Sequence, residues 1–175
     1  MHNSGIYSYA QQRHLQLKPR TLVHRSNVNK LSHMNSQHPR RVFERSIECL
    51  KSGRIDEAES MCREILQTDP GDINFVALLG SILAEKGELE EAEALLTRAV
   101  KAAPGHAKAL EDLGTVLLNL NRADQAIPYL TRASELRPEH PPLLSKLSGA
   151  YSGVGMGPEA EKYRLKAAAL SPDQA

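Results

Sequence analysis

Residues 73–106 read INFVALLGSILAEKGELEEAEALLTRAVKAAPGH, and this stretch decides the fold. On both sides of Gly87, apolar or small residues recur three and four positions apart, which is the spacing of one face of an α-helix. The first stripe is Val76, Leu79, Gly80 and Leu83, and the second is Leu89, Ala92, Leu95, Leu96 and Ala99. Because glycine tolerates the left-handed conformation that ends many helices, the stretch predicts two helices joined by a turn at Gly87.

The same pattern recurs along the chain with a period of 34 residues. Four columns keep this spacing in one register: a proline, an alanine, a glycine or asparagine, and a small residue. The columns are Pro70, Pro104, Pro138 and Pro172; Ala58, Ala92, Ala126 and Ala160; Gly53, Gly87, Asn121 and Gly155; and Ser46, Gly80, Gly114 and Ser148. The chain therefore divides into four repeats, which are 39–72, 73–106, 107–140 and 141–174.

Each column has a physical role in an antiparallel pair of helices. A small residue midway along the first helix, such as Gly114, lets the second helix approach closely, and the alanines are its small partners there. Glycine or asparagine ends the first helix. Proline closes the second helix because it cannot continue a helix interior.

This framework of small residue, glycine, alanine and proline resembles the tetratricopeptide repeat family. The resemblance implies an all-α fold, namely a right-handed helical-repeat solenoid (an α-α superhelix) of four antiparallel helix pairs. It indicates a fold more than a function, since repeat families share a scaffold rather than an activity.

Residues 1–38 lack the repeat and differ from it in charge. Up to residue 43 the chain has seven Lys and Arg and no Asp or Glu, a charge of +7; from Glu44 onward 15 Lys and Arg stand against 21 Asp and Glu, a charge of −6. We expect residues 1–38 to be a disordered basic tail. Two alternatives stay open: a targeting segment of the mitochondrial type, or a tail outside the mature protein, with translation starting at Met34 rather than Met1.

Composition also bears on the compartment. The apolar runs are far shorter than the ~20 residues that span a bilayer, and residues 1–10 lack the charged and apolar regions of a secretion signal. Two cysteines, Cys49 and Cys62, are too few for a disulfide framework and suit a reducing compartment. We therefore expect a cytoplasmic protein that does not enter membranes.

The repeats offer no evident catalytic chemistry. Cys49 and Cys62 fall on inward positions and are interpreted as small core residues, while His106 and His140 occupy equivalent turns between repeats. Nucleophile–histidine–acid sets, Gly-rich phosphate loops and Cys-x-x-Cys pairs cannot be assembled. The acidic, aromatic-poor repeats do not suit specific nucleic-acid binding. We expect no catalytic residues, no cofactor and no metal site.

The resemblance places a binding groove on the concave face, which the first helix of each repeat lines. The matching positions predict a peptide-binding groove formed by Phe43, Glu44, Ile47, Asn74, Leu78, Ser81, Glu85, Lys108, Glu111, Asp112, Thr115, Leu118, Asn119 and Lys146. One subclass of the family clamps the carboxylate of chaperone tails with Lys and Asn residues. The corresponding positions here hold Phe43, Ile47, Leu78 and Asp112, so we expect no such clamp. Apolar residues such as Leu78 next to Glu111 and Asp112 favour a basic or amphipathic peptide.

These observations predict a non-catalytic adaptor or scaffold that binds a protein segment, either a peptide or a helix, in the groove. A first alternative is a transferase-attached module, since KALEDLG at 108–114 resembles repeats that precede transferase domains of the sulfotransferase type. A second alternative is a scaffold that self-associates as a homo-oligomer through the fourth repeat. There Arg164 replaces the leucine type of Leu96 and Leu130, either as a polar outer face or as a position that packs on a missing fifth repeat.

Overall fold

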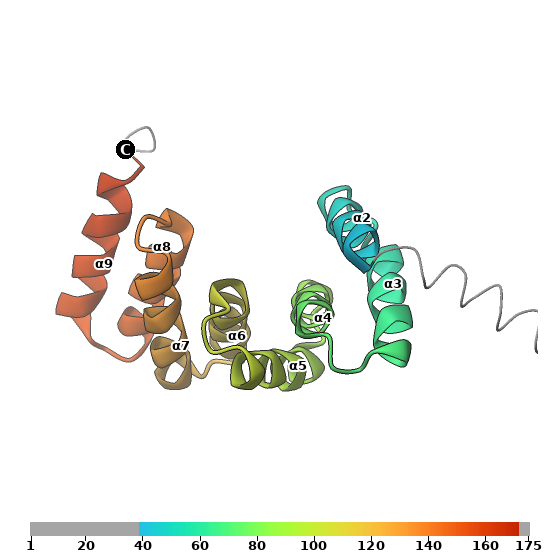
Figure 1. Ribbon diagram of the computed structural model, residues 1–175. Helices are drawn as coiled ribbons and strands as arrows, with labels where there is room; N and C mark the ends of the chain where they lie inside the picture. The colour runs from blue at the N-terminus through green and yellow to red at the C-terminus, as the bar shows by residue number, and fades with distance from the viewer. Residues whose placement is uncertain (1–38, 172–175) are drawn as a thin grey trace, which may run out of the picture. The chain divides into compact units, whose positions relative to one another are not determined.

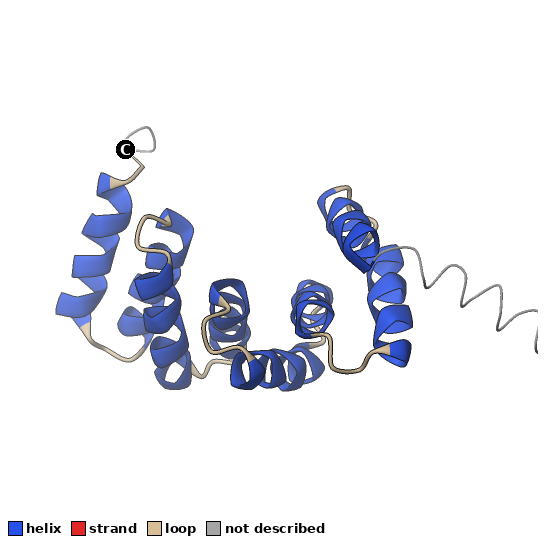
Figure 2. Cartoon of the chain, viewed as in Figure 1, coloured by secondary structure: helices blue, strands red, loops and turns tan. Residues whose placement is uncertain are grey.

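The computed structural model describes residues 39–171, so the tail expected to be disordered, 1–38, lies outside the described residues. The described part forms eight α-helices and, between residues 39 and 171, contains no strand (Figure 2). The helices are α2 Pro39–Lys51, α3 Ile55–Thr68, α4 Ile73–Lys86, α5 Leu89–Ala102, α6 Ala107–Asn119, α7 Ala123–Leu136, α8 Pro141–Gly153 and α9 Gly157–Ala169. The predicted all-α class is confirmed.

The helices form four pairs that stack in chain order. Each helix packs on the next, and in addition α4 touches α6 and α6 touches α8. The first helices of the pairs (α2, α4, α6 and α8) lie on the inner side of the array, and the second helices (α3, α5, α7 and α9) lie on its outer side (Figure 1). This arrangement is the helical-repeat solenoid that the 34-residue period predicts.

The small-residue column brings the two helices of a pair into contact. A Cβ atom added at Gly80 would lie 2.7 Å from Leu96 Cγ, and one added at Gly114 would lie 2.5 Å from Leu130 Cγ. Each leucine of the second helix therefore rests directly on a glycine of the first, and the contact predicted at Gly114 is confirmed. In the last repeat Ser148 replaces the glycine, and its hydroxyl donates a hydrogen bond of 2.7 Å to the carbonyl of Ala160.

The turns inside the pairs follow the glycine and asparagine column. Gly53, Gly87, Asn121 and Gly155 all have positive φ, from 59° at Asn121 to 83° at Gly87. Only glycine and, less readily, asparagine adopt this left-handed region without strain, which confirms the predicted role of the column.

The turns between pairs share an N-cap position. Asp72 accepts a hydrogen bond of 2.9 Å from the amide of Asn74, at the start of α4. The matching residues His106 and His140 accept through Nδ1 from the amides of Ala109 and Leu143, at 3.1 and 3.3 Å. The side chain therefore satisfies an amide that the first turn of each helix leaves without a partner. This capping explains why both histidines occupy equivalent turns.

Candidate binding face of the inner helices

All fourteen residues expected to line the groove lie on the inner helices, but their exposure differs widely. Glu44, Asn74, Glu85, Lys108 and Asn119 are exposed. Phe43, Ile47, Ser81, Thr115, Leu118 and Lys146 are half-buried. Leu78, Glu111 and Asp112 are buried, with 6, 4 and 7% of their surface exposed. We call the exposed and half-buried members the inner face.

Leu78 does not belong to the inner face. It is part of the apolar core, because α4 is enclosed by α3, α5 and α6 and buries residues around most of its circumference. The expectation that Leu78 is exposed to a partner is therefore wrong. Sequence periodicity could not reveal this burial, since the residues that cover Leu78 belong to neighbouring helix pairs.

Glu111 is also unavailable to a partner. Its carboxylate accepts hydrogen bonds from Arg137 Nη1 at 2.9 Å and from Lys146 Nζ at 2.8 Å. Burial alone raises the pKa of Glu111, but the hydrogen bond from Lys146 and the charges of Lys146, Lys108 and His140 outweigh burial and hold the pKa below its ordinary value. Glu111 is thus an ionised carboxylate whose charge is balanced by cationic side chains of the same chain.

Asp112, the next residue of α6, is also paired within the protein. Its carboxylate accepts from Lys108 Nζ at 2.6 Å and from the hydroxyl of Ser81 at 2.5 Å. Ser81 lies on α4, so this contact ties α4 to α6, just as the Glu111–Lys146 pair ties α6 to α8. The expectation that Glu111 and Asp112 attract a basic ligand is wrong, because both acids are buried and paired inside the array.

The inner face retains three half-buried apolar side chains on α2 and α6, which we call the apolar row. They are Phe43 and Ile47 on α2 and Leu118 on α6, each of which packs against the core while part of its surface stays accessible. Phe43 meets Phe75 edge to face, with ring centroids 5.4 Å apart and planes at 88°. That contact packs one part of Phe43 on a buried ring of α4, while the rest of its surface stays accessible.

Arg137 completes the charged network, although sequence analysis did not single it out. It follows α7, and its guanidinium bridges to Glu111 on α6. No periodic signal marks this residue, since it lies in the connection between two pairs and its partner is 26 positions away.

The cysteines and the metal-binding residue types bear on the chemistry that is open to the described residues. Within residues 39–171 there is no group of three or more His, Cys, Asp or Glu side chains that could hold a metal ion. Cys49 and Cys62 are buried free thiols, and burial raises the pKa of Cys62 to about 11, which keeps it protonated. Among the described helices, none is long and apolar enough to cross a membrane.

Comparisons with known proteins agree with this architecture. The chain matches the tetratricopeptide repeat family over residues 50–113 and 83–147. A search of curated proteins finds no match. Among solved structures, the chain is similar to MamA AMB-1 at 26% identity, with a TM-score of 0.63 and coverage of 74% of this chain and 76% of the other.

Two further structures show the same fold. A MamA RS-1 double mutant is 25% identical, with a TM-score of 0.69 and coverage of 77% of this chain and 76% of the other. Another crystal structure of MamA is 21% identical, with a TM-score of 0.68 and coverage of 87% and 79%. These similarities lend no support to the alternative of a module attached to a transferase.

Proposed function

This chain belongs to the tetratricopeptide repeat family, and from that premise we propose that it is a non-catalytic adaptor whose inner face binds a segment of a partner protein. The family scaffold is typical of protein-interaction modules rather than of enzymes. The proposal treats residues 39–174 as the binding domain and assigns the protein no cofactor and no catalytic step. The cytoplasmic location remains a prediction from the composition.

The observation that carries the proposal is the apolar row of the inner face. Phe43, Ile47 and Leu118 keep part of their apolar surface in contact with solvent, although each also touches the core. Covering such surface contributes about 25 cal/mol per Å² to binding. A partner that lies across α2, α4 and α6 gains this free energy without disturbing the packing of the array.

The paired acids alter the chemistry expected of that partner. Glu111 and Asp112 are neutralised by Lys146, Arg137 and Lys108, so they do not select for a basic ligand. Glu44 also pairs with Arg40, at 3.0 Å. We therefore propose an amphipathic segment whose apolar side meets the row, rather than a strongly basic peptide. The absence of a chaperone-tail clamp stays part of the proposal.

Site-specific photo-cross-linking tests this proposal. A photoreactive amino acid is placed at Ile47 or Leu118 on the inner side, and at the exposed residues Glu90 or Asp124 on α5 and α7 as matched outer controls. We expect one protein from the native cell extract to be cross-linked when the photoreactive residue is at either inner position. The same protein should not be cross-linked when that residue is at either outer position. Equal labelling from the outer positions, or no labelling from the inner ones, would contradict a partner site on the inner face.

A further inference from the structure

The inner helices α4, α6 and α8 begin at capping side chains, whereas the outer helices do not. The N-cap residues of α3, α5, α7 and α9 make no side-chain hydrogen bond to the first turn. In contrast, the first turns of α4, α6 and α8 are capped by Asp72, His106 and His140 in that order. The start of each of these inner helices therefore depends on the chemical state of one side chain.

The two kinds of cap differ in how they respond to acid. An aspartate carboxylate, such as that of Asp72, accepts hydrogen bonds throughout the pH range in which histidine changes charge. His106 and His140 accept through Nδ1, and only a ring that carries no proton on Nδ1 can do so. A proton on that nitrogen turns the acceptor into a donor, so the histidine cap is lost.

Protonation also places an unfavourable charge at the helix start. The amides of Ala109 and Leu143 donate to the two rings, and the N-terminus of a helix carries a partial positive charge. An imidazolium there repels the first turn, whereas the carboxylate of Asp72 at the matching place attracts it. The stability that each histidine cap contributes is therefore present above the range in which histidine titrates, and it is lost as the pH falls through that range.

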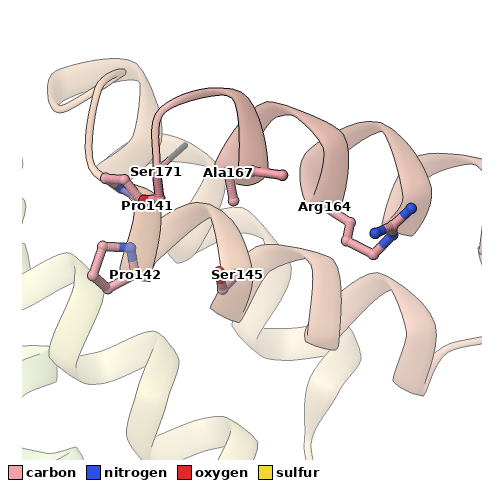
Figure 3. A pocket seen from close by; sticks show the side chains of 7 residues that line it. Pro141, Pro142, Ser145, Arg164, Ala167 and Ser171 are labelled. Carbon is pink, nitrogen blue, oxygen red and sulfur yellow. The ribbon is translucent and has the colours of Figure 1, made fainter. Parts of the chain in front are cut away.

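The start of α8 receives charged groups from each element around it. They are Glu111 of α6, Arg137 and Glu139 after α7, Lys146 of α8 and, lining a hollow at the start of α8, Arg164 of α9 (Figure 3). Glu111 interacts electrostatically with His140, but its carboxylate already accepts hydrogen bonds from Arg137 and Lys146. Glu139 is exposed, so solvent screens its attraction. A proton on His140 thus adds positive charge where two cations already balance the buried acid.

The start of α6 offers less to a protonated ring. Its charged groups are Lys108, Glu111 and Asp112 of α6 itself, Lys101 at the end of α5 and Arg137 after α7. Both of these acids are already paired with cations. In the 34-residue register, Ala77 of α4 stands for His106 where Glu111 of α6 stands for His140. The acid that favours a proton on His140 is thus replaced by an apolar residue at His106.

We propose that His106 and His140 make the array sensitive to mild acid, because their protonation releases the first turns of α6 and α8 while Asp72 holds the first turn of α4. The first turn of α8 contains Leu143 and Leu144, which are fully buried, so its release also weakens the packing of the core. This response is built into the array and does not depend on a partner at the inner face.

Urea denaturation of the full chain at about pH 7.5 and about pH 5.5 tests the response, because these values lie on either side of the range in which histidine titrates. The matched variant combines His106→Asn with His140→Asn, since asparagine is a good N-cap and does not titrate. We expect the unfolding equilibrium constant of the native chain, relative to that of the variant, to rise about fivefold for each cap as the pH falls. Asp72→Asn is the control and should leave the pH response of the native chain unchanged. A ratio between native chain and variant that does not change with pH would overturn the proposal.

Hydrogen exchange of single amides, corrected for the pH dependence of unprotected amides, locates the response. Protection of Ala109 and Leu143 in the native chain should fall about fivefold over the same pH change, whereas Asn74, which Asp72 caps, should keep its protection. In the asparagine variant all three amides should keep their protection. An equal loss at the three amides of the native chain, or no loss at Ala109 and Leu143, would contradict release of the histidine-capped turns.

Discussion

Lys146 on α8 donates a hydrogen bond of 2.8 Å to the buried carboxylate of Glu111 on α6, and this contact joins the last two inner helices. Glu111 has only 4% of its surface exposed, whereas the Lys146 side chain is 32% exposed. The lysine thus stabilises a charge that burial alone would disfavour.

Replacing this lysine should destabilise the array. Lys146→Met leaves Glu111 with Arg137 as its remaining hydrogen-bonding cation, so we expect the free energy of unfolding to fall by about 1–3 kcal/mol. Urea denaturation measures the change. Lys166→Met, at an exposed position of α9, is the control and should stay within about 0.5 kcal/mol of the native chain. The double variant Glu111→Gln, Lys146→Met should recover part of the loss, because it no longer buries a charge; no recovery would argue against this origin.

The same pair predicts a pH dependence. The folded-state pKa of Glu111 lies below its ordinary value of 4.5, so its contribution to stability is present above that value and is lost as pH falls through the folded pKa. The difference in unfolding free energy between the native chain and Lys146→Met should therefore be largest near neutral pH and shrink in acid. Unfolding curves from neutral to acidic pH measure it. A difference that does not change with pH would rule out the Glu111 charge as its source.

Gly114 should tolerate no larger side chain. Even the Cβ of an alanine would lie 2.5 Å from Leu130 Cγ, and Gly114→Leu should lower stability by about 1–3 kcal/mol or more. Gly149 on α8 offers a matched control, because an added Cβ there has no neighbour within 4 Å. Gly149→Ala should raise stability by about 0.5–1 kcal/mol, since alanine favours the helix. Thermal melting of Gly114→Leu and Gly149→Ala tests both expectations. Equal melting temperatures of the two variants would show that α6 and α7 are not in close contact at Gly114.

Substitutions at Leu78 and Ile47 distinguish a residue of the core from a residue of the proposed binding face. Leu78→Ser removes a buried side chain and should cost at least about 2 kcal/mol of stability. Ile47→Ser alters a half-buried residue and should cost about 1 kcal/mol, while weakening capture of the partner identified by cross-linking. Melting temperature and partner affinity are measured on the same two samples. If Ile47→Ser keeps full affinity, the apolar row does not form the partner site.

Local and periodic features of this fold follow from the sequence alone. The positive φ at Gly87 and Asn121 depends on the residue itself and on the helix that precedes it. The packing of Leu130 on Gly114 depends on two helices that a short turn joins. Because these interactions span few residues and recur every 34, their pattern is visible in the chain before it folds.

The exposure and charge state of the inner face were decided only by tertiary structure. Leu78 is buried because neighbouring helices enclose α4. Glu111 is neutralised by Arg137 and Lys146, which lie 26 and 35 positions away. Asp112 is paired with Lys108 on its own helix, but it also accepts a hydrogen bond from Ser81, which lies 31 positions away on α4. Repeat matching assigned Leu78 and Glu111 to the surface that a partner meets. Whether such positions face solvent or a neighbouring helix depends on the distance between successive inner helices, and that distance is set by how whole pairs pack.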